Sequence, residues 1–113
     1  MKIGIIGQGF VGTAVREGLK NFFNIETYDI AKESTCKTLD EICKKSNILF
    51  VCLPTPMKKD GSCYIGIVEE ALENIQACGY NKTIVVKSTI PPGTTAKWNK
   101  KFKNMDIVFN PEF

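Results

Sequence analysis

Residues 3–12 of the chain read IGIIGQGFVG, an apolar run that leads directly into a G-x-G-x-x-G loop made by Gly7, Gly9 and Gly12. In such a loop the first glycine lets the chain leave a strand in a tight turn. The second lets a pyrophosphate approach the backbone, and the third lets the next helix pack close to the strand. A helix that begins near Gly9 would direct unpaired N–H groups and its positive dipole end at the phosphates. This stretch therefore predicts a strand, a dinucleotide-binding loop and a helix.

An acidic residue follows at the spacing that such a site requires. Asp29 lies 17 residues beyond Gly12 and closes a second apolar-rich segment. Its carboxylate can accept hydrogen bonds from both hydroxyls of an adenosine ribose and would repel the 2′-phosphate of NADP, so the predicted cofactor is NAD. A glycine loop can also be a plain turn, but the strand before it, the amphipathic segment after it and the acid favour a nucleotide site.

Size and composition restrict the function further. A chain of 113 residues can form one domain, residues 1–113, and bury about two-thirds of its unfolded surface. The net charge of +3 comes from dispersed lysines without interleaved aromatic residues, which argues against a nucleic-acid partner. Five cysteines without a C-x-x-C pair, together with the absence of histidine, argue against a metal site. Without a signal peptide or a membrane-spanning stretch, we expect a cytoplasmic protein with reduced thiols and no membrane partner.

Segments of two periods alternate along the chain, and this alternation predicts a parallel sheet covered by helices. The expected strands are 2–6, 25–29, 47–52, 83–87 and 106–109. The expected helices are 11–22, 67–75 with Glu69, Glu70 and Glu73 facing water, and two short ones at 39–45 and 94–102. The fold class is therefore α/β, a Rossmann-type, doubly wound and mainly parallel sheet.

One connection is too short for a complete fold of this type. Residues 30–38 cannot hold a helix and a returning parallel strand, since such a crossover needs about a dozen residues. Either the third strand and its helix are missing, or residues 34–37 form a short, irregular edge. Numbering the strands as in a complete six-stranded sheet, we predict the order 2-1-4-5-6, with the third strand vestigial and every crossover right-handed.

Ligands of open parallel sheets bind beyond the carboxyl ends of the strands, and the loops at those ends are unusual here. They read LPTP at 53–56, STIPPGTT at 88–95 and NPEF at 110–113. Prolines fix the backbone around Thr55, and hydroxyl groups precede the rigid turn at 91–93. Each loop taken alone is also explained by loop punctuation, helix capping or a solvated terminal glutamate.

The chain resembles the amino-terminal domain of the UDP-glucose/GDP-mannose dehydrogenase family in six segments taken in order. These are GQGFVG at 7–12, YD at 28–29, CLPTP at 52–56, DGS at 60–62, KSTIPPGTT at 87–95 and NPEF at 110–113. The resemblance implies an NAD-dependent oxidoreductase that converts the 6-hydroxyl of a UDP-sugar to a carboxylate through an aldehyde and a cysteine-bound thioester.

The resemblance also implies roles for particular residues. The implied cofactor-binding residues are Gly7, Gly9, Phe10, Val11, Gly12, Asp29, Leu53, Pro54, Thr55, Ser88 and Thr89. Thr89 would in addition hold a water or substrate oxygen near the nicotinamide. Glu112 would be the acid and base that handles this water during thioester hydrolysis.

The family's nucleophilic cysteine, catalytic lysine and asparagine, and nucleotide-sugar domain fall in chain that is absent here. We therefore expect these 113 residues alone to bind NAD weakly and to turn over nothing, with the UDP-sugar bound through the missing C-terminal region and a homodimer compatible with the sequence. One alternative is a non-enzymatic nucleotide-binding or partner-binding module derived from such a dehydrogenase. Another is the first domain of a 3-hydroxyacid or 6-phosphogluconate-type dehydrogenase, against which KSTIPPGTT and NPEF argue.

Overall fold

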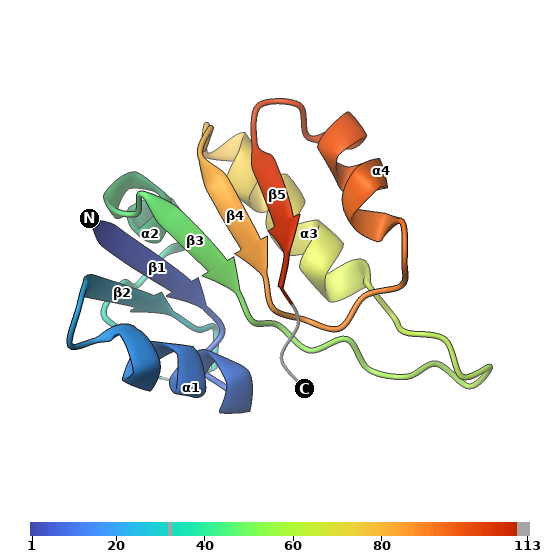
Figure 1. Ribbon diagram of the computed structural model, residues 1–113, viewed down its shortest axis with the longest axis horizontal. Coiled ribbons are helices and arrows are strands. Elements are labelled where there is room, and N and C mark those ends of the chain that lie inside the picture. Colours follow the sequence, from blue (N-terminus) through green and yellow to red (C-terminus); the bar gives the residue numbers. More distant parts are fainter. Residues whose placement is uncertain (32, 111–113) are drawn as a thin grey trace.

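The computed structural model describes residues 1–31 and 33–110, and within them five parallel strands form one sheet (Figure 1). The strands are β1 (Lys2–Ile6), β2 (Asn24–Tyr28), β3 (Ile48–Val51), β4 (Thr83–Val86) and β5 (Asp106–Phe109). The helices are α1 (Phe10–Leu19), α2 (Leu39–Lys45), α3 (Gly66–Ala77) and α4 (Thr94–Lys101). The strand order is β2-β1-β3-β4-β5, which is the predicted order once the third strand is left out. The Rossmann-type fold class is confirmed.

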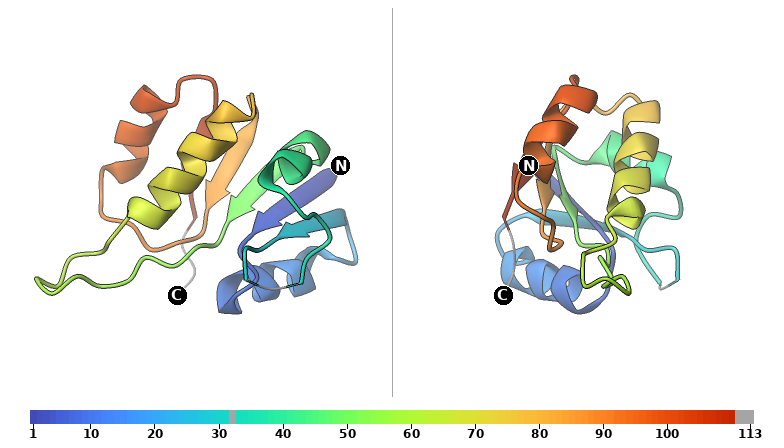
Figure 2. Two further views of the ribbon diagram at one scale, coloured as in Figure 1. Left: turned by 180° about the vertical axis from the view of Figure 1, so that it is seen from behind. Right: turned by 90° about the vertical axis from the view of Figure 1, so that its right-hand side faces the viewer.

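The helices lie on two faces of the sheet, as right-handed crossovers require. Within the plane of the sheet, α1 connects β1 to β2 in one direction. The connections through α2, α3 and α4 then add β3, β4 and β5 in the opposite direction. Consequently α1 lies on one face, and the other three helices lie on the opposite face (Figures 1 and 2). The core fills the space between the sheet and these three helices. Fully buried side chains in this layer include Leu49, Val51, Leu72, Ile75, Ile84, Val86 and Trp98.

The face that carries α1 is only partly covered. In the register of the sheet, one row of side chains runs from Ile5 through Phe50 and Val85 to Val108. Exposure rises from 0% at Ile5, near α1, to 42% at Val108 on the outer strand. No helix of the described chain lies in front of β3, β4 and β5 on this face (Figure 1), so an apolar stripe stays accessible to water.

At each edge of the sheet, one residue of the outer strand has its outward N–H and carbonyl groups occupied by hydrogen bonds from a neighbouring segment. At the β2 edge, the N–H of Thr27 donates to Thr35 Oγ1 at 2.7 Å, and the Thr27 carbonyl accepts from the N–H of Cys36 at 2.8 Å. At the β5 edge, the Asn99 side chain donates to the Ile107 carbonyl and accepts from the Ile107 N–H, both at 2.9 Å. These bonds occupy groups that a further strand would need for pairing.

The β2 edge decides between the two alternatives for the third strand. No regular strand forms within residues 30–31 and 33–38, so a regular third strand is missing. Instead, the segment forms a short, irregular edge beside β2, as in the second alternative. It bonds to the edge through Thr35 and Cys36 and then enters α2, whose N-cap Thr38 accepts from the Glu41 N–H at 3.1 Å.

The predicted boundaries differ from the structure by a residue or two at most ends, with one larger error. The helix expected over 11–22 ends at Leu19. Phe22 lies in the following turn and is 77% exposed, so its place on the apolar stripe of the helix was wrong. The stripe continued beyond the helix because periodicity in sequence does not mark where backbone hydrogen bonding stops.

Candidate nucleotide-binding site

The loop between β1 and α1 has a separate geometric reason for each of its three glycines. Gly7 has φ +96°, and a Cβ on it would lie 2.5 Å from the Cys52 carbonyl oxygen. A Cβ on Gly12 would overlap the Gly7 carbonyl oxygen, so α1 can pack against the loop only with a glycine there. A Cβ on Gly9 would meet nothing within 4 Å in residues 1–31 and 33–110 apart from its chain neighbours. Gly9 therefore faces open space, where a ligand could approach the backbone.

Backbone N–H groups begin α1 beside this open space. The first hydrogen bond of the helix runs from the Thr13 N–H to the Gly9 carbonyl at 3.0 Å. The N–H groups of Phe10, Val11 and Gly12 precede it and have no partner one turn earlier in the helix. Together with the helix dipole they favour an anion at this end of α1.

Asp29 follows β2 directly and is tied to the same loop. Its Oδ2 accepts from the Gln8 N–H at 2.6 Å, and its Oδ1 accepts from the Ala31 N–H at 2.8 Å. These two backbone donors fix the orientation of the carboxylate at the carboxyl end of the sheet. Because a carboxylate can accept about four hydrogen bonds, ribose hydroxyls can still bond to an acid held in this way.

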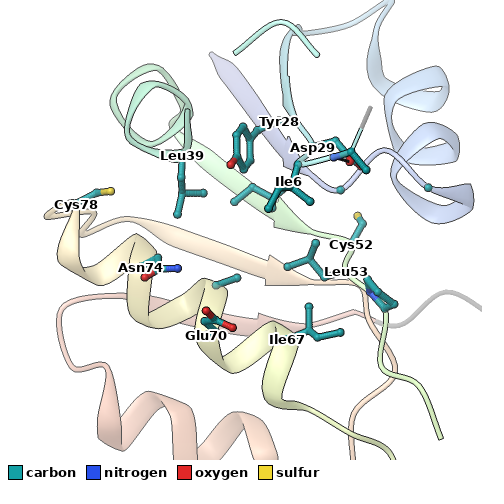
Figure 3. Close-up of a pocket in the computed structure, with 16 residues that line it drawn as sticks. Ile6, Tyr28, Asp29, Leu39, Cys52, Leu53, Ile67, Glu70, Asn74 and Cys78 are labelled. Carbon is teal, nitrogen blue, oxygen red and sulfur yellow. Dashed lines mark hydrogen bonds between the residues drawn. The ribbon is translucent and has the colours of Figure 1, made fainter. Parts of the chain in front are cut away.

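A groove of about 840 Å³ opens at Gly7, Gly9 and Asp29 and continues along α3 (Figure 3). Its walls are mostly apolar. Apolar lining side chains include Ile6, Ile30, Leu39, Leu53, Pro54, Ile67 and Ala71. The polar side chains beyond Asp29 are few and come from β2 and α3, namely Tyr28, Glu70 and Asn74. An apolar groove of this size with a few convergent polar groups is typical of a small-molecule site.

The loops after β3 and β4 meet behind the groove. Ser88 is buried, and its hydroxyl donates to the Leu53 carbonyl at 2.6 Å, which joins the two strand ends. Leu53 and Pro54 line the groove, whereas Thr55, Ser88 and Thr89 do not. Thr89 is exposed to solvent. The predicted residue Glu112 lies outside the described residues.

The structure therefore brings Gly7, Gly9, Asp29, Leu53 and Pro54 to one groove, with the first turn of α1 at its mouth. Sequence reasoning missed the polar side chains of the far part, Tyr28, Glu70 and Asn74. For Glu70 and Asn74 the signal was the helical spacing of positions 67, 70, 71 and 74, which places these residues on one face of α3; Tyr28, on β2, had no such signal. The expectation that all three acids of α3 face water was wrong for Glu69, which is half-buried and accepts from Trp98 Nε1 at 3.0 Å.

Neither a metal-binding cluster nor a reactive Cys43 thiol occurs in the part of the chain that the structure describes. No group of three His, Cys, Asp or Glu side chains is arranged to hold a metal ion among those residues. Burial raises the pKa of the Cys43 thiol to about 12, which keeps it protonated and unreactive at neutral pH.

Across residues 1–31 and 33–110, no helix is both long and apolar enough to cross a membrane.

The sheet topology, the glycine loop and the acid after β2 define a dinucleotide-binding domain of the Rossmann type. Comparison with known families makes this more specific. The model of the UDP-glucose/GDP-mannose dehydrogenase family, NAD binding domain, matches residues 25–113, so the chain belongs to this family. The match begins after the glycine loop, which makes the loop geometry independent support for nucleotide binding.

Individual relatives agree with this assignment. A UDP-glucose 6-dehydrogenase of Streptococcus pneumoniae is 26% identical in an alignment that covers all of this chain and 36% of the relative. Among solved structures, a UDP-glucose dehydrogenase from Pyrobaculum islandicum superposes with a TM-score of 0.84 at 22% identity over 99% of this chain. A GDP-mannose dehydrogenase from Pseudomonas aeruginosa gives a TM-score of 0.83 at 21% identity over the whole chain. These two structures support the fold.

The chain spans only part of the length of its relatives. It covers 36% of the Streptococcus protein and 36% of each of the two solved structures. The alignment with the Streptococcus protein extends over 142 residues for the 113 of this chain, so the relative also carries inserted segments within the aligned region. The short connection between β2 and α2 is consistent with one such difference.

Proposed function

We propose that this chain forms the NAD-binding part of an enzyme that oxidises the 6-hydroxyl of a UDP-sugar to a carboxylate. The observation that carries the proposal is the joint placement of the open backbone at Gly9 and the fixed carboxylate of Asp29 at the mouth of one apolar groove. Membership of the dehydrogenase family and the similarity to a UDP-glucose 6-dehydrogenase of Streptococcus pneumoniae support the substrate class.

The residues present fit a dinucleotide. The space beside Gly9 would admit a diphosphate against the N–H groups that begin α1, because among the described residues no atom beyond its chain neighbours lies within 4 Å of where a side chain would project. The Asp29 carboxylate would accept from the ribose hydroxyls, and the groove beyond it would take the adenosine half. When bound, NAD supplies a hydride acceptor. The protein's own contribution here is to bind and orient it.

Two further roles belong to the same proposal. Thr89 lies exposed just past the carboxyl end of β4, where its hydroxyl would hold a water or substrate oxygen. Glu112 would take a proton from that water during thioester hydrolysis. The nucleophile and the sugar contacts would come from protein outside these 113 residues. The chain alone therefore should bind NAD and produce no NADH from UDP-glucose.

Calorimetric titration of NAD into the wild type, Gly9→Ala and Asp29→Ala tests the binding site. The methyl group of Gly9→Ala would project into open space in the described part of the chain, so this variant should keep the fold. It should lower NAD affinity about tenfold or more, since the methyl group would occupy the diphosphate position. Asp29→Ala should lower affinity about 10- to 100-fold through lost charge-assisted hydrogen bonds. Gly18→Ala, also in open space but far along α1, is the matched control. Equal NAD binding by all four proteins would contradict the proposed site.

A further inference from the structure

The far part of the groove has a chemical character that differs from its mouth. Beyond Asp29 it follows one face of α3, and its polar side chains there are Glu70 and Asn74 on α3 and Tyr28 on the opposite wall (Figure 3). The surfaces around them are apolar, with Leu39, Leu53 and Ile67 among the lining residues. Three polar side chains in an otherwise apolar groove can form hydrogen bonds with the edge of a planar ligand, while the apolar side chains contact its flat faces.

The position of this region relative to Asp29 indicates which part of a dinucleotide would reach it. This step rests on the proposed function: with the ribose on Asp29 and the diphosphate at Gly9, the purine base is the next group along the groove. Ile30 follows Asp29 immediately, lines the groove and is 94% exposed, which is unusual for such a large apolar side chain. Together with Leu53 and Ile67 it offers apolar surface to the faces of a base.

The three polar side chains differ in what they can discriminate. A tyrosine hydroxyl and an asparagine amide can each donate and accept, so they adapt to either a 6-amino or a 6-oxo purine. A carboxylate only accepts. A 6-amino group presents two N–H donors, whereas a 6-oxo group presents an acceptor that a carboxylate repels. Of the three, the Glu70 carboxylate is therefore the group whose chemistry best separates adenine from hypoxanthine.

We propose that Glu70 accepts a hydrogen bond from the 6-amino group of adenine and makes this domain selective for adenine dinucleotides over their 6-oxo counterparts. Asn74 and Tyr28 contribute hydrogen bonds to the same base edge without deciding its identity. In this way α3 adds base recognition to the diphosphate and ribose contacts made by the β1–α1 loop and Asp29. Selectivity thus comes from one helix face of this chain.

The test compares two ligands that differ at one position of the base, NAD and nicotinamide hypoxanthine dinucleotide, by calorimetric titration. The wild type should bind NAD about tenfold more tightly than the hypoxanthine analogue, the effect of one hydrogen bond to a charged group at a solvent-accessible site. Glu70→Ala should reduce this preference to about threefold or less, mainly by weakening NAD. Glu70→Gln, whose amide can donate as well as accept, should also lose most of the preference while it keeps more NAD affinity than Glu70→Ala.

Glu73→Ala is the matched control, because Glu73 is on the same helix but its carboxylate bonds to Lys101 Nζ at 3.0 Å. This variant should keep the wild-type ratio, and thermal unfolding of each variant checks that the fold is intact. Equal affinities of the wild type for both ligands, or an unchanged ratio in Glu70→Ala, would overturn the role of Glu70 while leaving the NAD site in place. Failure of the wild type to bind either dinucleotide would instead overturn the proposed function and this inference with it.

Discussion

Two glycines on the same helix should respond in opposite ways to the same substitution. At Gly12 an alanine Cβ would overlap the Gly7 carbonyl oxygen and lie 2.8 Å from the Gly7 carbonyl carbon. Both atoms belong to the backbone of a tight turn, so no side-chain rotation relieves the contact, and α1 must move away from the loop. At Gly18 an alanine Cβ would lie in open space, with no other element of the described chain within 4 Å.

The magnitudes follow from these contacts. Replacing glycine by alanine within a helix stabilises it by about 0.5–1 kcal/mol, which Gly18→Ala should gain without opposition. Overpacking costs about 1–3 kcal/mol, and contact with rigid backbone places Gly12→Ala toward the upper end. Because both variants gain the same helix propensity, their free energies of unfolding should differ by the overpacking cost, about 3 kcal/mol. At roughly 4 °C per kcal/mol for a domain near 100 residues, their Tm values should differ by about 12 °C.

Thermal and urea unfolding followed by circular dichroism measures both variants against the wild type. Gly18→Ala should have a Tm slightly above the wild type, and Gly12→Ala should have a Tm clearly below it. NAD affinity should also fall in Gly12→Ala, because the displaced helix carries the diphosphate-binding N–H groups. If Gly12→Ala were as stable as Gly18→Ala, close packing of α1 on the loop would not be the reason for this glycine.

Three further outcomes can be measured. Asn99→Ala leaves the outer N–H and carbonyl of Ile107 without this partner, so urea unfolding should show a loss of about 1–2 kcal/mol, and size-exclusion chromatography should show concentration-dependent association through the opened edge. The hydrogen bond that Thr35 donates to Glu26 lowers the pKa of the Glu26 carboxyl below its ordinary value of 4.5. This hydrogen bond should therefore stabilise the fold fully above pH 4.5, and the stabilisation should be lost as the pH falls through the lowered pKa. In Thr35→Val, NMR titration should show this pKa returning toward 4.5. A thiol reagent at pH 8 should modify Cys43 only after unfolding, since burial raises its pKa to about 12.

The elements that sequence reasoning predicted well are those set by local patterns. Continuous apolar runs marked the strands, and the G-x-G-x-x-G loop followed by Asp29 marked the mouth of the site, because turn geometry and close approach restrict residue type at each of these positions. The end of α1 was wrong at Phe22, since an apolar residue can follow a helical stripe without belonging to the helix. The roles of Thr89 and Glu112 stay predictions.

Contacts between distant segments were beyond the reach of local patterns. Nothing near Asn99 in the sequence indicates that its side chain closes the β5 edge at Ile107, and nothing near Glu70 indicates that it lines the same groove as Asp29. Such pairings depend on how the helices pack on the sheet, which involves residues far apart in the chain.

The sequence by itself determined the class of fold, the absence of room for a third strand and the chemistry of the loop at the mouth of the groove. It did so because glycine and proline set the backbone geometry locally, and because continuous apolar runs and helical spacing mark buried strands and helix faces within short stretches of sequence. Only the tertiary structure decided how the sheet edges are closed, which half of the sheet stays open to water and which side chains of α3 extend the groove. These features arise where separate elements meet, and their positions depend on the packing of the whole domain.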